Sequence, residues 1–217
     1  MFAQVLYTQW KWARTELVLY VLAAFLIPTI IIRTGFSYVI TYDIHSALGV
    51  STLAGVCLAA LAMLCAFGLA WRPYILDAGL KHVGPLSLPV SWGAFVRMRF
   101  LAGATLLLIP AAAVWFGGVL AAASVTIPPT LHAYPGGLAI RFYLASLVAY
   151  AAAFALQYVA GKHAVRVAVI VLVVVAVAEI AAQMIGFSSI VAGAWNMLTN
   201  WPGPFAVFAA RWMLIDV

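Results

Sequence analysis

The chain has 217 residues, of which 67% are apolar or aromatic and only 7% are charged. Because roughly 25% of the residues of a soluble domain are charged, this composition indicates an integral membrane protein and excludes a large extramembrane catalytic domain. The formal net charge of +6 comes from basic residues between apolar runs, which is typical of a membrane topology signal rather than of nucleic-acid binding.

The first segment, residues 1–16, mixes aromatic, apolar and basic side chains. The pattern predicts an interfacial helix on the membrane surface, with Lys11, Trp12 and Arg14 at that surface. Alternatively, the same residues are the aromatic and basic anchor of the first span. No basic region followed by a short apolar stretch and a cleavage site opens the chain, so we expect the N-terminus to be retained.

Five apolar runs within residues 17–187 can each cross a hydrocarbon core of roughly 30 Å, the first only marginally. The runs are 17–32, 47–71, 100–127, 138–160 and 167–187. Pro28 and Pro110 each remove a backbone hydrogen bond, and we expect the third run to be broken or strongly kinked. Residues 125–137 hold three prolines and two glycines, which predicts a loop.

The basic residues predict the orientation of the bundle. With the N-terminus inside, eight Lys and Arg lie on the inner side and three on the outer side, which favours a cytoplasmic N-terminus. The inner set is Lys11, Arg14, Arg72, Lys81, Arg97, Arg99, Lys162 and Arg166, and the outer set is Arg33, Arg141 and Arg211. We therefore expect an all-α, polytopic helical bundle of five spans in the cell (inner) membrane.

The tail, residues 188–217, is harder to interpret, because residues 195–204 break the helical pattern. It is interpreted as external or re-entrant, as interfacial, or as part of a sixth span. Re-entrant backbone requires a covering of protein or water, so a partner helix or a second copy would stabilise it.

The longest inner connection, residues 72–99, carries several turn-forming residues. Its pattern predicts a short helix over 74–83, an extended stretch, and a second helix for which Ser91 is the N-cap. Such a connection is either a docking element for a soluble partner or an ordinary amphipathic connector.

These residues resemble the ABC-2 type permeases, the membrane subunits of a class of ATP-binding-cassette transporters. The resemblance rests on Asp77, the Leu-Ser-Leu-Pro run at 86–89, the following Val-Ser, and the basic helix start at Arg97 to Arg99. The segment Thr8 to Arg14 resembles the amphipathic elbow helix of that family. The likeness covers about residues 1–125, and two further spans follow in the expected order, whereas the family usually has six spans.

The resemblance implies a homodimer or heterodimer of permease subunits with separate ABC ATPase subunits that bind and hydrolyse ATP. It also implies that the connection contacts the ATPase. The residues assigned to that contact are Asp77, Lys81, His82, Leu86, Ser87 and Pro89. The sequence itself has no phosphate-binding loop, so this chain is expected to be neither catalytic nor to bind a cofactor, and ATP is expected in the partner.

Polar residues inside the spans are a second group of candidates. Glu179 and Gln183 share one face of the fifth span and are either a substrate or proton site or an interhelical hydrogen-bonded pair. Gln157 in the fourth span is interpreted as an interhelical contact. The low charge of the spans favours an amphiphilic substrate, although nothing identifies it.

Four histidines indicate a different class, a membrane anchor or haem b subunit of a multi-subunit complex. His45 and His132 are expected near the outer surface, and His82 and His163 near the inner one. All four lie in or beside loops and no haem-attachment motif occurs, so this remains the alternative. Asp43 with His45 lacks further ligands nearby, so no metal site is predicted.

Overall fold

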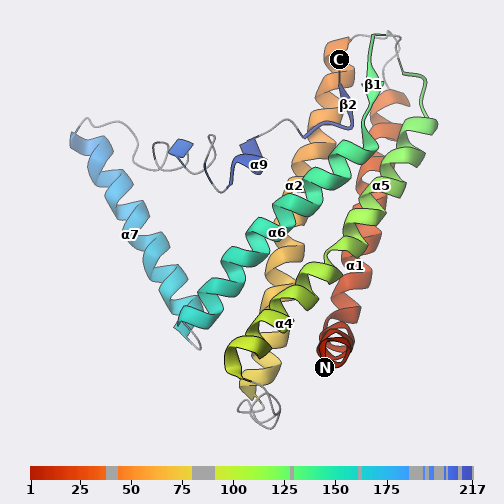
Figure 1. Ribbon diagram of the computed structural model, residues 1–217. Coiled ribbons are helices and arrows are strands. Elements are labelled where there is room, and N and C mark those ends of the chain that lie inside the picture. Colours follow the sequence, from red (N-terminus) through yellow and green to blue (C-terminus); the bar gives the residue numbers. More distant parts are fainter. Residues whose placement is uncertain are drawn as a thin grey trace.

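The computed structural model describes residues 1–37, 44–79, 91–127, 130–160 and 163–185, together with 193, 196–197, 203, 205–209 and 212–216. Within these residues the chain is mostly helical, as predicted (Figure 1). The helices are α1 (Phe2–Ser37), α2 (Ile44–Gly79), α4 (Trp92–Leu106), α5 (Leu108–Ala123), α6 (Pro135–Ala160), α7 (Ala164–Ile185) and α9 (Ala206–Ala209). Two short strands, β1 (His132–Ala133) and β2 (Ile215–Asp216), complete the described elements.

Four helical segments of the described chain are long and apolar enough to cross a membrane. They are Phe2–Phe36, Ala47–Leu76, Trp92–Ala123 and Pro135–Tyr158. These segments contain the first two of the five predicted apolar runs and overlap most of the third and fourth, and the helix of the first run extends well into its flanks. The described part of the chain therefore has four helical segments that are compatible with a membrane protein, the third of which consists of α4 and α5.

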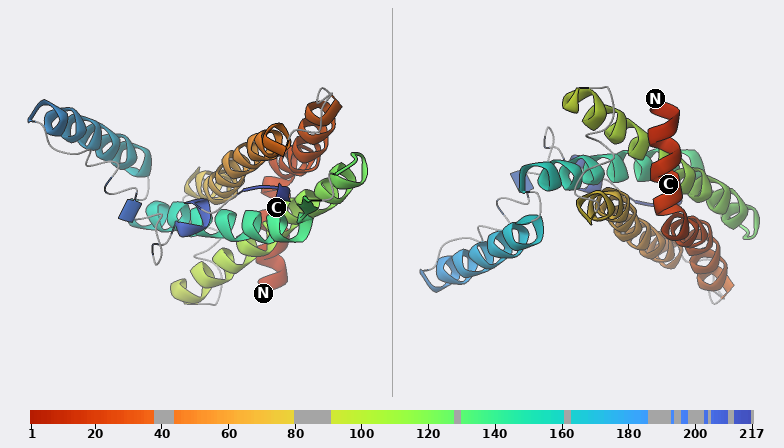
Figure 2. Two further views of the ribbon diagram at one scale, coloured as in Figure 1. Left: turned by 90° about the horizontal axis from the view of Figure 1, so that it is seen from above. Right: turned by 90° about the horizontal axis from the view of Figure 1, so that it is seen from below.

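Helix α1 is continuous from Phe2 to Ser37, but its first turns run across the bundle. They are seen end-on in Figure 1 and side-on in the views of Figure 2, whereas the rest of α1 rises along the bundle. Gln9, Ala13 and Leu17 form a buried stripe at four-residue spacing, so this N-terminal section packs against the protein along one face. The predicted N-terminal helix is thus present, joined to the first span without a break.

The third apolar run is broken, as predicted. Helix α4 ends at Leu106, Leu107 is a turn residue, and α5 begins at Leu108. Pro110 has no N–H to donate to the carbonyl four residues earlier, at Leu106, which favours the end of α4 at that residue. The two halves are therefore separate helices that share one passage through the bundle.

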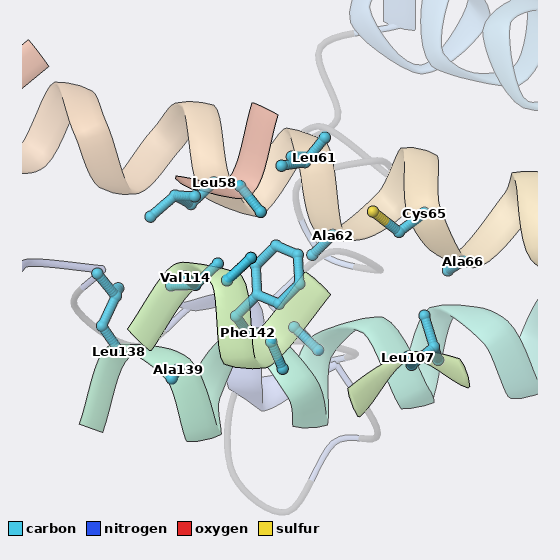
Figure 3. Close-up of a cluster of buried hydrophobic side chains, with 14 of the residues drawn as sticks. Leu58, Leu61, Ala62, Cys65, Ala66, Leu107, Val114, Leu138, Ala139 and Phe142 are labelled. Atoms are coloured by element: carbon cyan, nitrogen blue, oxygen red, sulfur yellow. The ribbon is translucent and has the colours of Figure 1, made fainter. Parts of the chain in front are cut away.

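Helices α1, α2, α5 and α6 pack around the core shown in Figure 3. Phe142 of α6 lies between α2 and α5, against Leu58, Ala62 and Val114. Small residues let the backbones approach closely, as is common between membrane helices. At Gly117 of α5, a Cβ atom would lie 2.5 Å from the carbonyl oxygen of Phe25 in α1.

The tail returns to the bundle as an extended segment. Residues Ile215–Asp216 pair antiparallel with His132–Ala133 in the connection between α5 and α6. The described part of 188–217 contains α9, of four residues, and this strand, so in that part no sixth span is formed. The strand pair is also the exception to the predicted all-α class.

Helix α7 diverges from the other helices after its start beside the end of α6 (Figure 1). Its 22 residues coincide with the fifth predicted run except for short differences at the ends. Val169, Val173, Val177 and Ile180 are exposed on it. In a membrane these side chains would meet lipid or another protein.

Candidate functional site

The bundle has two distinct ends. The N-terminal end holds the first turns of α1, the end of α2 and the start of α4, and the opposite end holds β1, β2 and the start of α6 (Figure 1). Two long polar side chains are almost fully buried near the N-terminal end: Gln9 of α1 is 3% exposed and Arg99 of α4 is 7% exposed. Buried polar groups between membrane helices are functional candidates by default.

Two tyrosines of α6 complete this polar cluster. The Gln9 amide donates a hydrogen bond to the hydroxyl of Tyr150, which itself donates to the backbone carbonyl of Arg99 at 3.5 Å. The Arg99 guanidinium donates to the hydroxyl of Tyr158. We call Gln9, Arg99, Tyr150 and Tyr158 the polar cluster, and it connects α1, α4 and α6.

Gly103 of α4 makes this arrangement possible. A Cβ atom at Gly103 would overlap the Tyr150 hydroxyl and would lie 3.0 Å from the Gln9 amide nitrogen. Only a residue without a side chain lets α1 and α6 bring their polar groups to the backbone of α4 at this point. The sequence therefore needs glycine here for close approach.

Aromatic rings surround the cluster. The Arg99 guanidinium carbon lies 5.9 Å from the centroid of the Phe95 ring, within the range of a cation–π contact. Phe154 packs against Tyr158 and Tyr150, with ring centroids 4.5 Å and 5.7 Å apart. The rings form the apolar surroundings of the cluster, and within the described part of the chain the buried Oε1 of Gln9 has no hydrogen-bond partner.

The cluster is suited to holding helices together rather than to acid–base catalysis. Its members are an amide, two phenols and a guanidinium, which stays protonated. Glu16, a carboxylate near this end, is engaged elsewhere: its Oε1 lies 3.6 Å from Nε of Arg72 in α2, and both side chains are partly exposed. Such an exposed ion pair contributes little stability.

The predicted N-cap at Ser91 is confirmed. Ser91 has an extended backbone, and its hydroxyl accepts a hydrogen bond from the N–H of Ala94 at 3.4 Å. The cap precedes Trp92, the first residue of α4, so the last part of the 72–99 connection is helical. The two described ends of this connection, the end of α2 and the start of α4, lie at the same end of the bundle (Figure 1).

The proposed ATPase-contact residues are only partly within the described chain. Asp77 lies in the last turns of α2, where its backbone is described. Residues 74–79 belong to α2 instead of forming a separate short helix. The remaining candidates lie outside the described residues: Lys81, His82, Leu86, Ser87 and Pro89.

The N-terminal candidates lie on the transverse section of α1. Lys11 and Arg14 are exposed and Trp12 is half-buried, which fits a helix with one face on the protein and one on a membrane surface. Their exposure contrasts with the burial of Gln9 on the opposite face.

The two intramembrane candidates of α7 are not brought to the polar cluster. Glu179 is half-buried and lies nearer the end of α7 than its start, and Gln183 follows one turn later. Since α7 diverges from the bundle, these residues and the polar cluster belong to different parts of the molecule (Figure 1).

Of the histidines, His45 lies in the first turn of α2, and His132 and His163 lie at opposite ends of the bundle. His132 is exposed in β1 and lies opposite Asp216 in the strand register, whereas His163 is exposed at the start of α7, at the other end. Among the residues that the structure describes, no group of three or more His, Cys, Asp or Glu could hold a metal ion.

The polar cluster was not predicted from the sequence. The pattern of basic residues assigns Arg99 to an inner connection, although Arg99 lies four residues after Phe95 and seven before Leu106, on the buried face of α4, while Arg97 is exposed. The signal in the sequence that indicates the burial of Arg99 is its helical spacing from Phe95 and Leu106, which are buried in the same helix. The tyrosine partners in α6 could not be paired with Gln9 and Arg99 without the fold.

Comparisons with protein-family models, with curated proteins and with solved structures found no match for this chain.

Proposed function

We propose that this chain is a permease subunit of an ABC-2 type ATP-binding-cassette transporter, in which separate ATPase subunits drive an amphiphilic substrate across the cell membrane. One observation carries the proposal: the transverse section of α1, the two ends of the 72–99 connection and the buried polar cluster all gather at one end of a membrane-spanning bundle. A force applied at that end would reach three helices at once.

Helix α4 is the part that would receive this force. Its first turn begins at Trp92, after the N-cap Ser91, and the turn at Leu107 separates it from α5. It can therefore tilt while α5 stays packed against α1 through the close contact at Gly117. In this mechanism the polar cluster transmits the tilt of α4 to α1 and α6.

The energy source would be a partner subunit, since the sequence has no phosphate-binding loop. Helix α7 would supply a fifth span, because 22 residues at roughly 1.5 Å per residue reach across a core of roughly 30 Å. The permease would work as a homodimer or heterodimer, with the N-terminus cytoplasmic.

The test is charge reversal at the connection. Asp77→Lys is expected to reduce the amount of ATPase that co-purifies with the tagged chain, because it replaces an anionic position near the docking end with a cationic one. The control is Thr126→Lys, which adds a positive charge at an exposed position near the opposite end. Equal ATPase recovery with both variants, at unchanged elution volume, would contradict the docking role.

A further inference from the structure

The transverse section of α1, residues 2–16, presents one face to the outside of the molecule. Tyr7, Lys11 and Arg14 follow one another at spacings of four and three residues, so they lie on one side of the helix, and all three are exposed. Gln9 and Ala13 lie on the opposite side and are buried against the protein. We call Tyr7, Lys11 and Arg14 the basic stripe.

Contacts on the buried side fix the direction in which the basic stripe points. The Gln9 amide donates a hydrogen bond to the hydroxyl of Tyr150 in α6. A Cβ atom at Gly103 of α4 would lie 3.0 Å from the Gln9 amide nitrogen, so α1 and α4 approach closely here. Because rotation of the transverse section about its own axis would break these contacts, the basic stripe is held facing away from the bundle.

The charge of this face has no counterpart in its own segment. Residues 1–15 contain two basic residues, Lys11 and Arg14, and neither Asp nor Glu. Glu16, the first acidic residue, pairs with Arg72 of α2 at 3.6 Å. Within the described part of the chain, neither Lys11 nor Arg14 has an ion-pair partner. The groups that complement the basic stripe are therefore anions outside this part of the molecule.

Exposed aromatic rings beside the stripe indicate where those anions are. Phe2 and Trp10 are 40% and 39% exposed, and Tyr7 of the stripe itself is 66% exposed. Tyr and Trp rings are enriched at the level of lipid headgroups. The section also runs across the bundle at the end of a helix of spanning length, as Figure 2 shows, which is the direction of a helix in the membrane interface.

From these observations we propose that the basic stripe binds the phosphates of anionic lipid headgroups and enriches anionic lipid around the N-terminal end of the bundle. The charge selects the anionic headgroup, and the rings favour a bilayer over the acidic surface of a soluble protein. The lipid would contact the face of α1 opposite Gln9, which belongs to the polar cluster. The proposal adds a partner and does not rest on the permease assignment.

Lipid contact at the stripe is measured by fluorescence quenching. A bimane label is attached to a cysteine at Thr15, which is exposed one turn after Lys11, in a chain in which Cys57 and Cys65 are replaced by alanine. The chain is reconstituted in vesicles of equal parts phosphatidylglycerol and phosphatidylcholine, and only one of the two lipids carries brominated acyl chains. The composition of the vesicles is then constant, and only the identity of the quenching lipid changes.

We expect brominated phosphatidylglycerol to quench the label at least about twofold more than brominated phosphatidylcholine, because the two cations attract anionic headgroups. Joint replacement Lys11→Gln and Arg14→Gln should make the two lipids quench equally. Joint replacement Lys11→Arg and Arg14→Lys retains both charges and should retain the difference. Arg33→Gln, at an exposed position near the other end of α1, is the matched control and should also retain it.

Salt provides a test without any substitution in the stripe. At roughly 1 M ionic strength the Debye length is about 3 Å, so the preference for phosphatidylglycerol should fall. Equal quenching by the two lipids at low salt would overturn the proposal, as would a preference that survives both glutamine replacements. Absence of quenching by either lipid would overturn it as well and would favour a protein partner on this face. These vesicles contain no ATPase, so every outcome is independent of the permease assignment.

Discussion

The buried amide of Gln157 illustrates how one residue stabilises an irregular membrane helix. Oriented so that both of its polar atoms have partners, it donates to the carbonyl of Ala70 at 2.9 Å and accepts from the N–H of Trp71 at 3.1 Å. Both lie in the turn before Pro73, which disturbs the hydrogen bonding of α2 at this point. Gln157 therefore bonds α6 to the backbone of α2 within one turn of Pro73, whose missing N–H frees the carbonyl of Leu69 rather than that of Ala70.

Replacement of Gln157 by leucine should lower the free energy of unfolding by about 1–2 kcal/mol, because the Ala70 carbonyl loses a buried donor. The measurement is unfolding of the purified protein in mixed detergents of increasing denaturant fraction. Gln4→Leu, at an exposed position in α1, is the control and should be nearly neutral. Equal stability of the two variants would show that the interhelical bond contributes nothing.

The interhelical role of Gln157 could be predicted from the sequence, since a lone amide in an apolar run has few other uses. The burial of Arg99 could not, because Arg97 and Arg99 look alike in a basic helix start. What distinguishes them is that Arg99 lies on the face of Phe95 and faces the tyrosines of α6, and this requires the fold.

Among the elements, the passage formed by α4 and α5 shows how a proline permits independent movement. Pro110→Ala supplies an N–H for the Leu106 carbonyl and should join α4 and α5 into one helix. We expect slower amide hydrogen exchange at Leu107 and its neighbours and weaker coupling to the partner ATPase. Unchanged exchange there would show that packing, rather than the proline, causes the break.

The crossing of α1 and α5 is a second feature at this scale. Thr29, next to Pro28, donates its hydroxyl to the Phe25 carbonyl at 2.9 Å and to the Gly117 carbonyl at 3.3 Å. Phe25 and Thr29 of α1 thus meet Gly117 of α5 at one contact, where the two backbones approach closely.

Gly117→Ala should destabilise this crossing by about 1–3 kcal/mol, since a Cβ atom would be forced against the Phe25 carbonyl. Thermal denaturation followed by size-exclusion chromatography measures the effect. At Gly93 of α4 a Cβ meets nothing within 4 Å, so Gly93→Ala should retain the stability of the original chain. A Gly117→Ala protein as stable as the Gly93→Ala protein would contradict the close crossing.

At the scale of the whole molecule, the helices and the break near Pro110 follow from apolar runs and proline positions, and both were predicted. The tail strand Ile215–Asp216 was not predicted, because the residues that bond to it, Ser51 of α2 and His132 and Ala133 of β1, are far apart in the sequence. The sequence of residues 212–216 has no periodic pattern that indicates a strand. The divergence of α7 from the bundle has no sequence signal either.

The orientation of the bundle can be tested with single cysteines in a background lacking Cys57 and Cys65. Because exposed Lys11, Arg14, Arg72 and Arg97 lie toward the N-terminal end, we expect that end to be cytoplasmic. A cysteine at Thr126 should then react with an impermeant reagent in intact cells, and one at Ala3 only after permeabilisation. The reverse pattern would contradict the orientation.

The most direct measurement of the central claim is gentle purification of the chain from its native membrane, with identification of stoichiometric partners by mass spectrometry and a visible spectrum of the same sample. The account predicts a co-purifying subunit with a phosphate-binding loop and no Soret band. A Soret band, or a redox partner without any ATPase, would contradict it and would favour the haem-containing or anchor subunit instead.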